Sequence, residues 1–203
     1  MTEFCVYIEG GGNTAQQKKE LRLGFQAFFR ELLDGASDRG HTMWIILCGG
    51  RQNTFEDFQT AQRANPKAVN ILLVDAEAPV VTTPWAHLSG HDGWRTPGVG
   101  DDVCHLMVQT VEAWLVADPN ALADYYGHGF RREVLPRRPA VEDIPKADLL
   151  PALERASQDT AKGRYRKIQH CAELLGRLDT AAVRQRASHC ERLFVTLSAL
   201  LGR

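Results

Sequence analysis

Short apolar runs alternate with amphipathic segments along the first half of the chain. Phe4–Ile8, Met43–Leu47 and Asn70–Val74 are short and apolar, which is typical of buried strands. Between them, apolar residues recur at helical spacing over residues 14–33 and about 53–63. This alternation predicts an α/β fold: an open sheet of mostly parallel strands flanked by helices.

Local signals predict the ends of these helices. Thr14-Ala-Gln-Gln17 matches a capping box, and Asp34-Gly35 is expected to end the first helix. Asn53 or Thr54 is expected to cap the second. A further capping box, Ser188-x-x-Glu191, is expected to open the last helix of the chain.

The periodicity is weaker after residue 78. Residues 79–103 are rich in Pro, Gly, His and Trp and predict a long loop over one end of the sheet. Beyond it, the sequence predicts a strand at His105–Gln109 and a short helix at Val111–Asp118. A Pro- and Arg-rich connector at Arg131–Pro145 leads to three final helices at about 147–157, 165–177 and 188–201.

The length of 203 residues suits one domain, with an α/β core at 1–130 and a basic helical extension at 131–203. The first part holds 9 basic and 16 acidic residues and the second holds 15 and 9, although the whole chain has a net charge of only −1. This asymmetry suggests a metal-binding half beside a half that contacts anions.

Several protein classes are disfavoured. The longest apolar runs are far shorter than the ~20 residues that span a bilayer, and Glu3 stands where a signal peptide carries positive charge. We therefore expect a cytoplasmic protein without membrane contact. Five cysteines without a C-x-x-C pair argue against a disulfide framework and the common zinc spacings.

Acidic residues follow three of the predicted strands. Glu9 comes after the first strand, Asp75 and Glu77 after the third, and Glu112 soon after the fourth. The carboxyl ends of parallel strands form one edge of a sheet, where ligands bind. Clustered carboxylates favour a hard cation such as Mg²⁺ or Mn²⁺. Single acids at strand ends also occur as helix caps or solvated loop residues. The prediction of a metal site therefore depends on the combination, in which Ile-Glu-Gly and Asp-x-Glu follow apolar strands in the expected order.

Two basic groups are candidates for phosphate or nucleic-acid binding. The first follows the loop of Gly10, Gly11 and Gly12 at a predicted helix start, and comprises Lys18, Lys19 and Arg22. The second surrounds Tyr165, which is expected to stack on a base, and includes Lys162, Arg164 and Lys167. A solvated helix face is the alternative for both. The glycine loop lacks the acid of a dinucleotide site at Cys48-Gly49-Gly50, and no P-loop motif is present.

The four tryptophans divide into two expected groups. Trp44 and Trp114 are expected in the core. Trp85 and Trp94, with the neighbouring His91-Asp92, are expected to form a lid or a partner surface near the acidic edge.

The motifs Ile8-Glu9-Gly10 and Asp75-Ala76-Glu77 resemble those of Toprim domains, the metal-binding fold of topoisomerases, DnaG-type primases, OLD-family nucleases and RloB-like proteins. Over most of its length the chain is similar to a group of Toprim-like bacterial proteins in which Val108–Trp114 with Asp118 recurs as a unit. Glu77 departs from the second aspartate of the Toprim motif, which leaves open whether one or two metals bind.

The resemblance implies that Glu9 is a metal ligand or the general acid/base, that Asp75 and Glu77 are ligands, and that Glu112 is an added ligand. It also implies a Mg²⁺-dependent nuclease acting on DNA or RNA, with a role in phage defence beside an ATPase partner. The alternatives are a degenerate interaction module and a small-molecule phosphohydrolase or phosphotransferase. The sequence does not indicate an oligomeric state.

Overall fold

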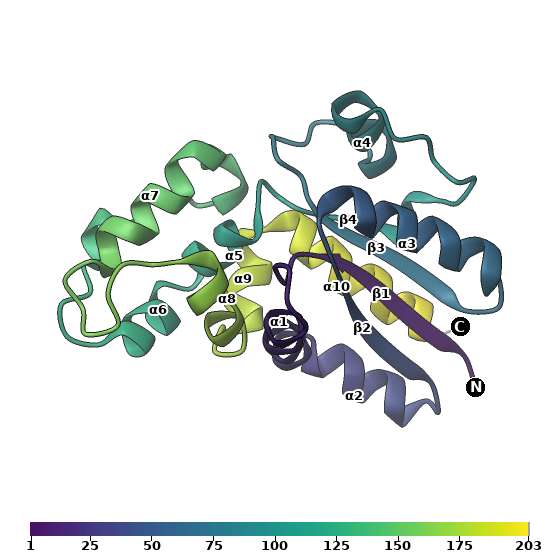
Figure 1. Cartoon of the computed structure of the whole chain (residues 1–203), viewed down its shortest axis with the longest axis horizontal. Coiled ribbons are helices and arrows are strands. Elements are labelled where there is room, and N and C mark those ends of the chain that lie inside the picture. The colour runs from purple at the N-terminus through teal and green to yellow at the C-terminus, as the bar shows by residue number, and fades with distance from the viewer. Residues whose placement is uncertain (203) are drawn as a thin grey trace.

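The computed structural model describes residues 1–202, which form an open, all-parallel four-stranded sheet flanked by helices (Figure 1). The strands are β1 (Glu3–Glu9), β2 (Thr42–Gly49), β3 (Val69–Asp75) and β4 (Cys104–Met107), in the order β2-β1-β3-β4. The α/β prediction is therefore confirmed. All residues of β3 except the first are buried, as expected of a strand with a neighbour on each side.

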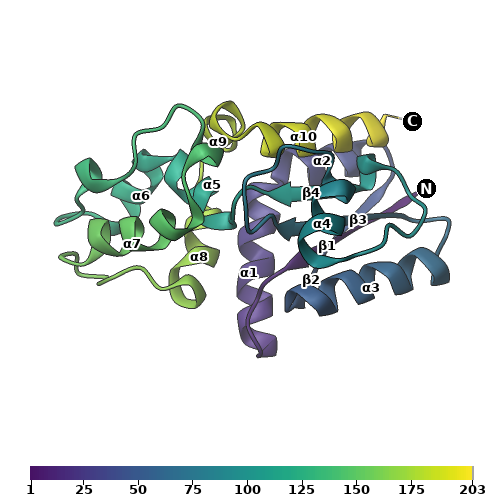
Figure 2. The ribbon, with the colours of Figure 1, turned by 90° about the horizontal axis from the view of Figure 1, so that it is seen from above.

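Helices cover both faces of the sheet (Figure 2). One face packs against α1 (Ala15–Phe28), α2 (Arg30–Asp38) and α10 (Ser188–Leu201). The other packs against α3 (Arg51–Ala64) and α4 (Pro84–Asp92).

The remaining helices gather beside the carboxyl ends of the strands (Figure 1). They are α5 (Val111–Ala117), α6 (Pro119–Tyr126), α7 (Lys146–Ser157), α8 (Lys167–Leu175) and α9 (Thr180–Arg186). The segment between α6 and α7 contains the 3-10 turns Arg132–Val134 and Val141–Asp143, and a further 3-10 turn, Asp101–Val103, precedes β4. The carboxyl edge of the sheet, where the predicted acids lie, therefore faces these five helices.

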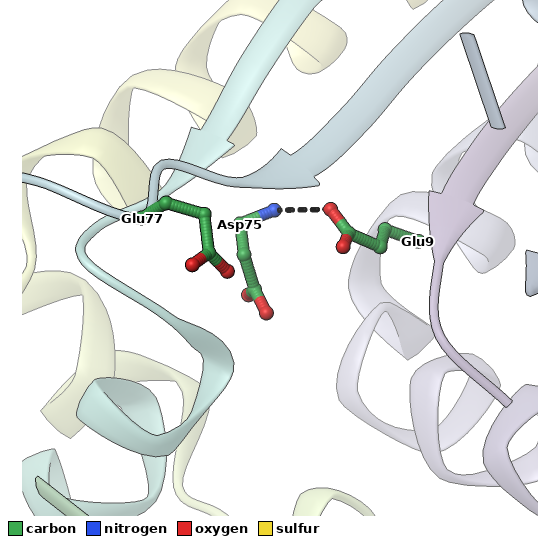
Figure 3. A group of neighbouring side chains, drawn as sticks. All are labelled: Glu9, Asp75 and Glu77. Carbon is green, nitrogen blue, oxygen red and sulfur yellow. Dashed lines mark hydrogen bonds between the residues drawn. The ribbon is translucent and has the colours of Figure 1, made fainter. Parts of the chain in front are cut away.

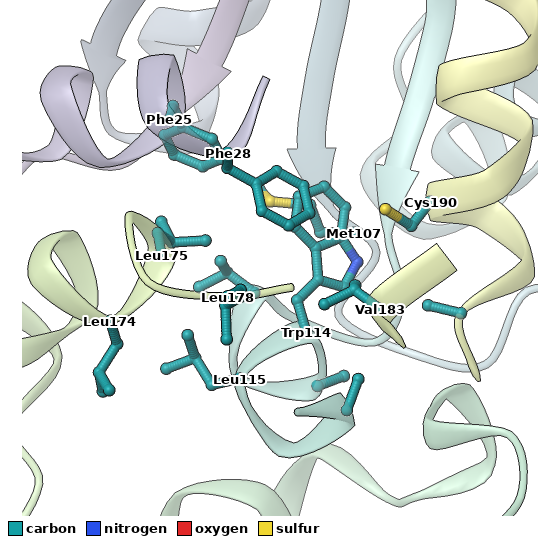
Figure 4. Packing of buried hydrophobic residues seen from close by; sticks show 14 of the residues in the cluster. Phe25, Phe28, Met107, Trp114, Leu115, Leu174, Leu175, Leu178, Val183 and Cys190 are labelled. Atoms are coloured by element: carbon teal, nitrogen blue, oxygen red, sulfur yellow. The ribbon is translucent and has the colours of Figure 1, made fainter. Parts of the chain in front are cut away.

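The main core joins the two halves of the sequence (Figure 4). Trp114 of α5 is fully buried and stacks on Phe28 of α1 with ring centroids 5.1 Å apart. Phe194 of α10 meets the same Phe28 ring edge-on at 5.9 Å. The basic C-terminal helices thus complete the core that α1 and the sheet begin.

The predicted helix ends are partly right. Thr14 and Gln17 form the predicted capping box, in which the Gln17 N–H donates to the Thr14 hydroxyl at 3.2 Å. The helical segment breaks at Phe29 but runs past Gly35 to Asp38, so the predicted stop was wrong. Helix α3 begins at Arg51, directly after Gly50, and not at Asn53 or Thr54.

The second capping box does not form. Ser188 lies inside the first turn of α10, and its hydroxyl donates to the Glu142 carboxylate at 2.7 Å. Glu191 pairs with Arg184 instead, at 2.6 Å. Partners outside α10 therefore replace the contacts within the helix that the motif predicted.

The prediction of a structureless loop at 79–103 was also wrong, because this stretch contains α4 and a 3-10 turn. Trp85 and Trp94 are buried against α3, and the Trp94 ring stacks on Phe55 at a centroid distance of 4.2 Å. They form no exposed surface for a partner protein. Trp44, predicted in the core, is 53% exposed on the edge strand β2, whereas Trp114 is buried as predicted.

Two short helices, α6 and α9, were not predicted, since each has too few turns to show a clear period. Within residues 1–202, none of the helices combines the length and the apolar character needed to cross a bilayer.

Candidate metal centre

The predicted acidic residues converge at the carboxyl edge of the sheet (Figure 3). Glu9 ends β1 and Asp75 ends the adjacent β3, while Glu77 lies two residues further on. One carboxylate oxygen from each of the three lies within 4.8 Å of the others. The sequence prediction that separate strands deliver these acids to one place is confirmed.

The three carboxylates fit a divalent cation. Oxygen ligands at 2.0–2.1 Å from an octahedral Mg²⁺ lie about 3 Å apart when adjacent and about 4 Å apart when opposite. A spread of up to 4.8 Å needs only small side-chain rotations to reach those separations. Three carboxylate oxygens are also the hard donors that Mg²⁺ and Mn²⁺ prefer.

Backbone contacts hold all three acids in place. The Asp75 N–H donates to Glu9 Oε2 at 3.2 Å, and Asp75 Oδ1 accepts the N–H of Val111, at the start of α5, at 2.8 Å. Glu77 has a φ of +67°, a left-handed conformation uncommon outside glycine, and its N–H donates to the Gln109 carbonyl at 2.8 Å. The turn after β3 therefore directs the Asp75 and Glu77 carboxylates to the same side.

Arg51, which the sequence analysis missed, fixes Glu9 from α3. Its guanidinium donates to Glu9 Oε2 at 3.0 Å and to the Asp75 carbonyl, and it makes two bonds of 2.7 Å with Asp92 of α4. It also lies 5.0 Å from the centre of the Trp94 ring. Burial lowers the pKa of Arg51, but the carboxylates of Asp92 and Glu9 raise it by more.

Lys167, at the start of α8, contacts the opposite side of the cluster. Its ammonium lies 3.3 Å from Asp75 Oδ2 and 3.3 Å from Glu112 Oε2. The buried Tyr165 donates its hydroxyl to Glu112 Oε1 at 3.3 Å. Tyr165 is thus a buried support for Glu112, and the prediction that it stacks on a base was wrong.

Burial sets the protonation of Asp75. Desolvation raises its pKa to about 6, in spite of the ammonium of Lys167, which lowers it; Glu9 and Glu112 raise it further. Close negative charges and few water contacts both disfavour the ionised carboxylate. A divalent cation between Asp75, Glu9 and Glu77 would relieve this repulsion.

A cavity of about 190 Å³ opens beside the acids. Its polar wall includes Glu9, Asp75, Lys167 and the backbone of Gly11 and Gly12, and its apolar wall includes Leu21, Phe25, Val111, Ile168, Cys171 and Ala172. A second, more open depression of about 610 Å³ also borders Lys167 and includes Glu77, Glu112 and Lys146. Lys146 also forms an ion pair with Glu77.

The other predicted basic residues lie outside this centre. Lys18 donates to the Cys48 carbonyl at 3.1 Å and so supports the end of β2, while Lys19 and Arg22 are exposed on α1. Lys162 lies over the Tyr125 ring at 4.5 Å, and Arg164 is 3.8 Å from Glu154. Of the two predicted basic groups, only Lys167 contacts the acids.

Glu112, predicted as an added ligand, is not among the three acids whose oxygens lie within 4.8 Å of one another. It is paired with Lys167 and Tyr165 instead. Of the predicted pair His91-Asp92, Asp92 reaches the acids only indirectly, because its carboxylate forms an ion pair with Arg51.

The comparisons with known proteins give a family but no function. A family model described as a domain of unknown function, DUF4276, matches residues 8–198, almost the whole chain. No curated protein and no solved structure matches the chain.

Proposed function

We propose that this protein, which belongs to the DUF4276 family, is a divalent-metal-dependent phosphodiesterase acting on DNA or RNA. The supporting observation is a group of three carboxylates at the sheet edge that line two depressions, Glu9 and Asp75 the first and Glu77 the second. A phosphodiester carries two substituents on its phosphorus atom, so the two depressions offer room for one substituent each. The resemblance to Toprim-like nucleases points to the same chemistry.

Glu9, Asp75 and Glu77 would hold the metal ion. When bound, Mg²⁺ or Mn²⁺ would supply positive charge for a phosphate oxygen and lower the pKa of a coordinated water. Mg²⁺ is the preferred candidate because it is held by few carboxylates together with water and substrate phosphate.

The chain supplies further groups for the phosphate. The ammonium groups of Lys146 and Lys167 lie at the same edge, each paired with acids of the centre. Lys146 can turn to a non-bridging phosphate oxygen once a metal neutralises Glu77. Lys167 can offer its third N–H to the phosphate while it stays between Asp75 and Glu112. Gly11 and Gly12 have no side chains, so a phosphate can approach their backbone in the cavity closely.

Cleavage assays with Asp75→Asn test the proposal, since asparagine keeps an acceptor for the Val111 N–H. We expect wild type to cleave single-stranded DNA or RNA with Mg²⁺ and not with EDTA. A metal contributes several kcal/mol to such reactions, so the variant should lose on the order of 10³-fold in rate. Glu20→Gln, on the exposed face of α1, is the matched control. Undiminished cleavage by Asp75→Asn would contradict the assignment.

A second candidate, a small-molecule phosphohydrolase, is favoured by the apolar wall of the 190 Å³ cavity. A compact apolar group attached to phosphate fits there, whereas a long strand needs only the open edge. Parallel assays with oligonucleotides and nucleoside monophosphates separate the two. Turnover of the monophosphates alone would favour the second candidate.

A further inference from the structure

The acidic edge has two halves that share Asp75. On one side, Asp75 faces Glu9 and Glu77, the candidate metal ligands. On the other side, it faces Glu112, and the ammonium of Lys167 lies between them, 3.3 Å from an oxygen of each.

The surroundings leave one oxygen of each carboxylate for Lys167. Asp75 Oδ1 accepts the Val111 N–H, and Glu112 Oε1 accepts the Tyr165 hydroxyl. The remaining oxygens, Asp75 Oδ2 and Glu112 Oε2, both contact the ammonium. The two side chains are only 7% and 6% exposed, so water screens their repulsion poorly and the ammonium between them relieves it.

Backbone packing fixes the helix that carries Lys167. Helix α8 crosses α1 so closely that a Cβ atom on Gly24 would lie 2.3 Å from the Ala172 carbonyl oxygen. Lys167 is the first residue of α8, where the helix dipole disfavours a cation. Its position is therefore explained by the two carboxylates and not by the helix.

We propose that the Lys167 ammonium is the second cation of this centre, so that the protein binds one divalent ion at Glu9, Asp75 and Glu77. The inference rests on the proposed metal-dependent function. Two-metal phosphoryl-transfer sites hold ions about 3.5–4 Å apart, joined by shared ligands. Asp75 is the shared carboxylate here, and Lys167 takes the second position with a compact charge and three hydrogen-bond donors.

Metal stoichiometry tests this proposal directly. Each folded variant is dialysed to equilibrium against Mn²⁺, and the bound metal per chain is measured by atomic emission. We expect one ion for wild type and two for Lys167→Met, because the variant leaves Asp75 and Glu112 facing each other without a cation. The double variant Lys167→Met/Glu112→Gln removes one of the two acids and should return to one ion.

Lys146→Met is the matched control, because Lys146 pairs with the single acid Glu77 and its loss should leave the ratio at one. Lys167→Ala, with the same expected ratio of two, replaces Lys167→Met if circular dichroism shows that the latter is unfolded. Two ions in wild type, or one ion in a folded variant without Lys167, would overturn the proposal. No ion in wild type would instead overturn the metal-dependent function.

Discussion

Arg51 and Lys167 reach the same acidic edge from opposite sides, but their surroundings differ. Arg51 comes from α3 and contacts Glu9, the Asp75 carbonyl, both oxygens of Asp92 and the Trp94 ring. Lys167 comes from α8 and contacts two carboxylates, with 45% of its side chain exposed against 19% for Arg51. The comparison separates a structural clamp on Glu9 from a more exposed cation that balances the charge of two buried acids.

The largest expected effect concerns the clamp. Arg51→Met leaves Glu9 and Asp92 without their cation in a mostly buried site, and we expect a loss of about 2–4 kcal/mol in the free energy of unfolding. Urea denaturation measures it. Arg177→Met, which breaks an exposed pair with Glu173, should cost well under ~1 kcal/mol.

Saturating Mn²⁺ sharpens the comparison. The loss in the free energy of unfolding of Arg51→Met should persist, because a metal at Glu9 cannot replace the contacts with Asp92 and Trp94. A variant as stable as wild type would contradict the role of Arg51 as a clamp.

The next effect concerns the placement of Lys167. Gly24→Ala puts a methyl group against the Ala172 carbonyl, so α1 and α8 must separate, at a cost of about 1–3 kcal/mol. Thermal and urea unfolding measure this loss. Gly35→Ala in α2, where a new Cβ would meet only a flexible Arg39 nitrogen at 3.4 Å, should be neutral or slightly stabilising. Equal effects of the two substitutions would exclude close packing as the cause.

A buried histidine remote from the acids gives a smaller, pH-dependent effect. In β4, His105 Nε2 lies 3.1 Å from the Asp102 carbonyl and Nδ1 lies 3.0 Å from the Arg192 guanidinium. These partners select the neutral ring. Burial, followed by the charge of Arg192, lowers the pKa of His105 to about 3.

The unfolded chain takes up a proton at this residue near pH 6.5 and the folded chain does not, so stability falls as the pH drops below about 6.5. Between pH 7.5 and 5.5 the loss from this residue is about 1.4 kcal/mol. Urea unfolding of wild type and His105→Gln at both pH values measures it. The same pH dependence in both proteins would show that another group is responsible.

The smallest test concerns the helix that follows the glycine loop. Thr14→Ala removes the capping contact with Gln17 and should cost about 1 kcal/mol. Ser198→Ala, on the exposed face of α10, removes no capping contact and should be close to neutral. Urea unfolding ranks the two, and a reversed order would contradict the observed caps.

These contrasts explain what the sequence could predict. The apolar pattern of Phe4–Ile8 and Asn70–Val74 predicted parallel strands, and parallel pairing alone brings Glu9 and Asp75 together. The partners of those acids depend on packing between distant segments, which no local pattern encodes. Lys167 is 92 residues from Asp75, and Asp92 is 41 residues from Arg51.

The tryptophans illustrate the same limit. Trp94 lies in an irregular, polar stretch, yet that stretch covers the face of the sheet on which Phe55 lies. Trp44 lies in an apolar strand, but β2 is an edge strand and leaves it exposed. One signal for Arg51 was available: it follows Gly49-Gly50 at the carboxyl end of β2, the same edge that receives Glu9.

Anomalous diffraction from crystals grown with Mn²⁺ is the most direct test of the central claim. The account predicts one peak per chain, about 2.0–2.2 Å from oxygens of Glu9, Asp75 and Glu77, with the Lys167 ammonium still beside Glu112. Crystals of Asp75→Asn should lose the peak. Mn²⁺ bound only elsewhere, or no peak at the carboxyl edge of the sheet, would contradict it.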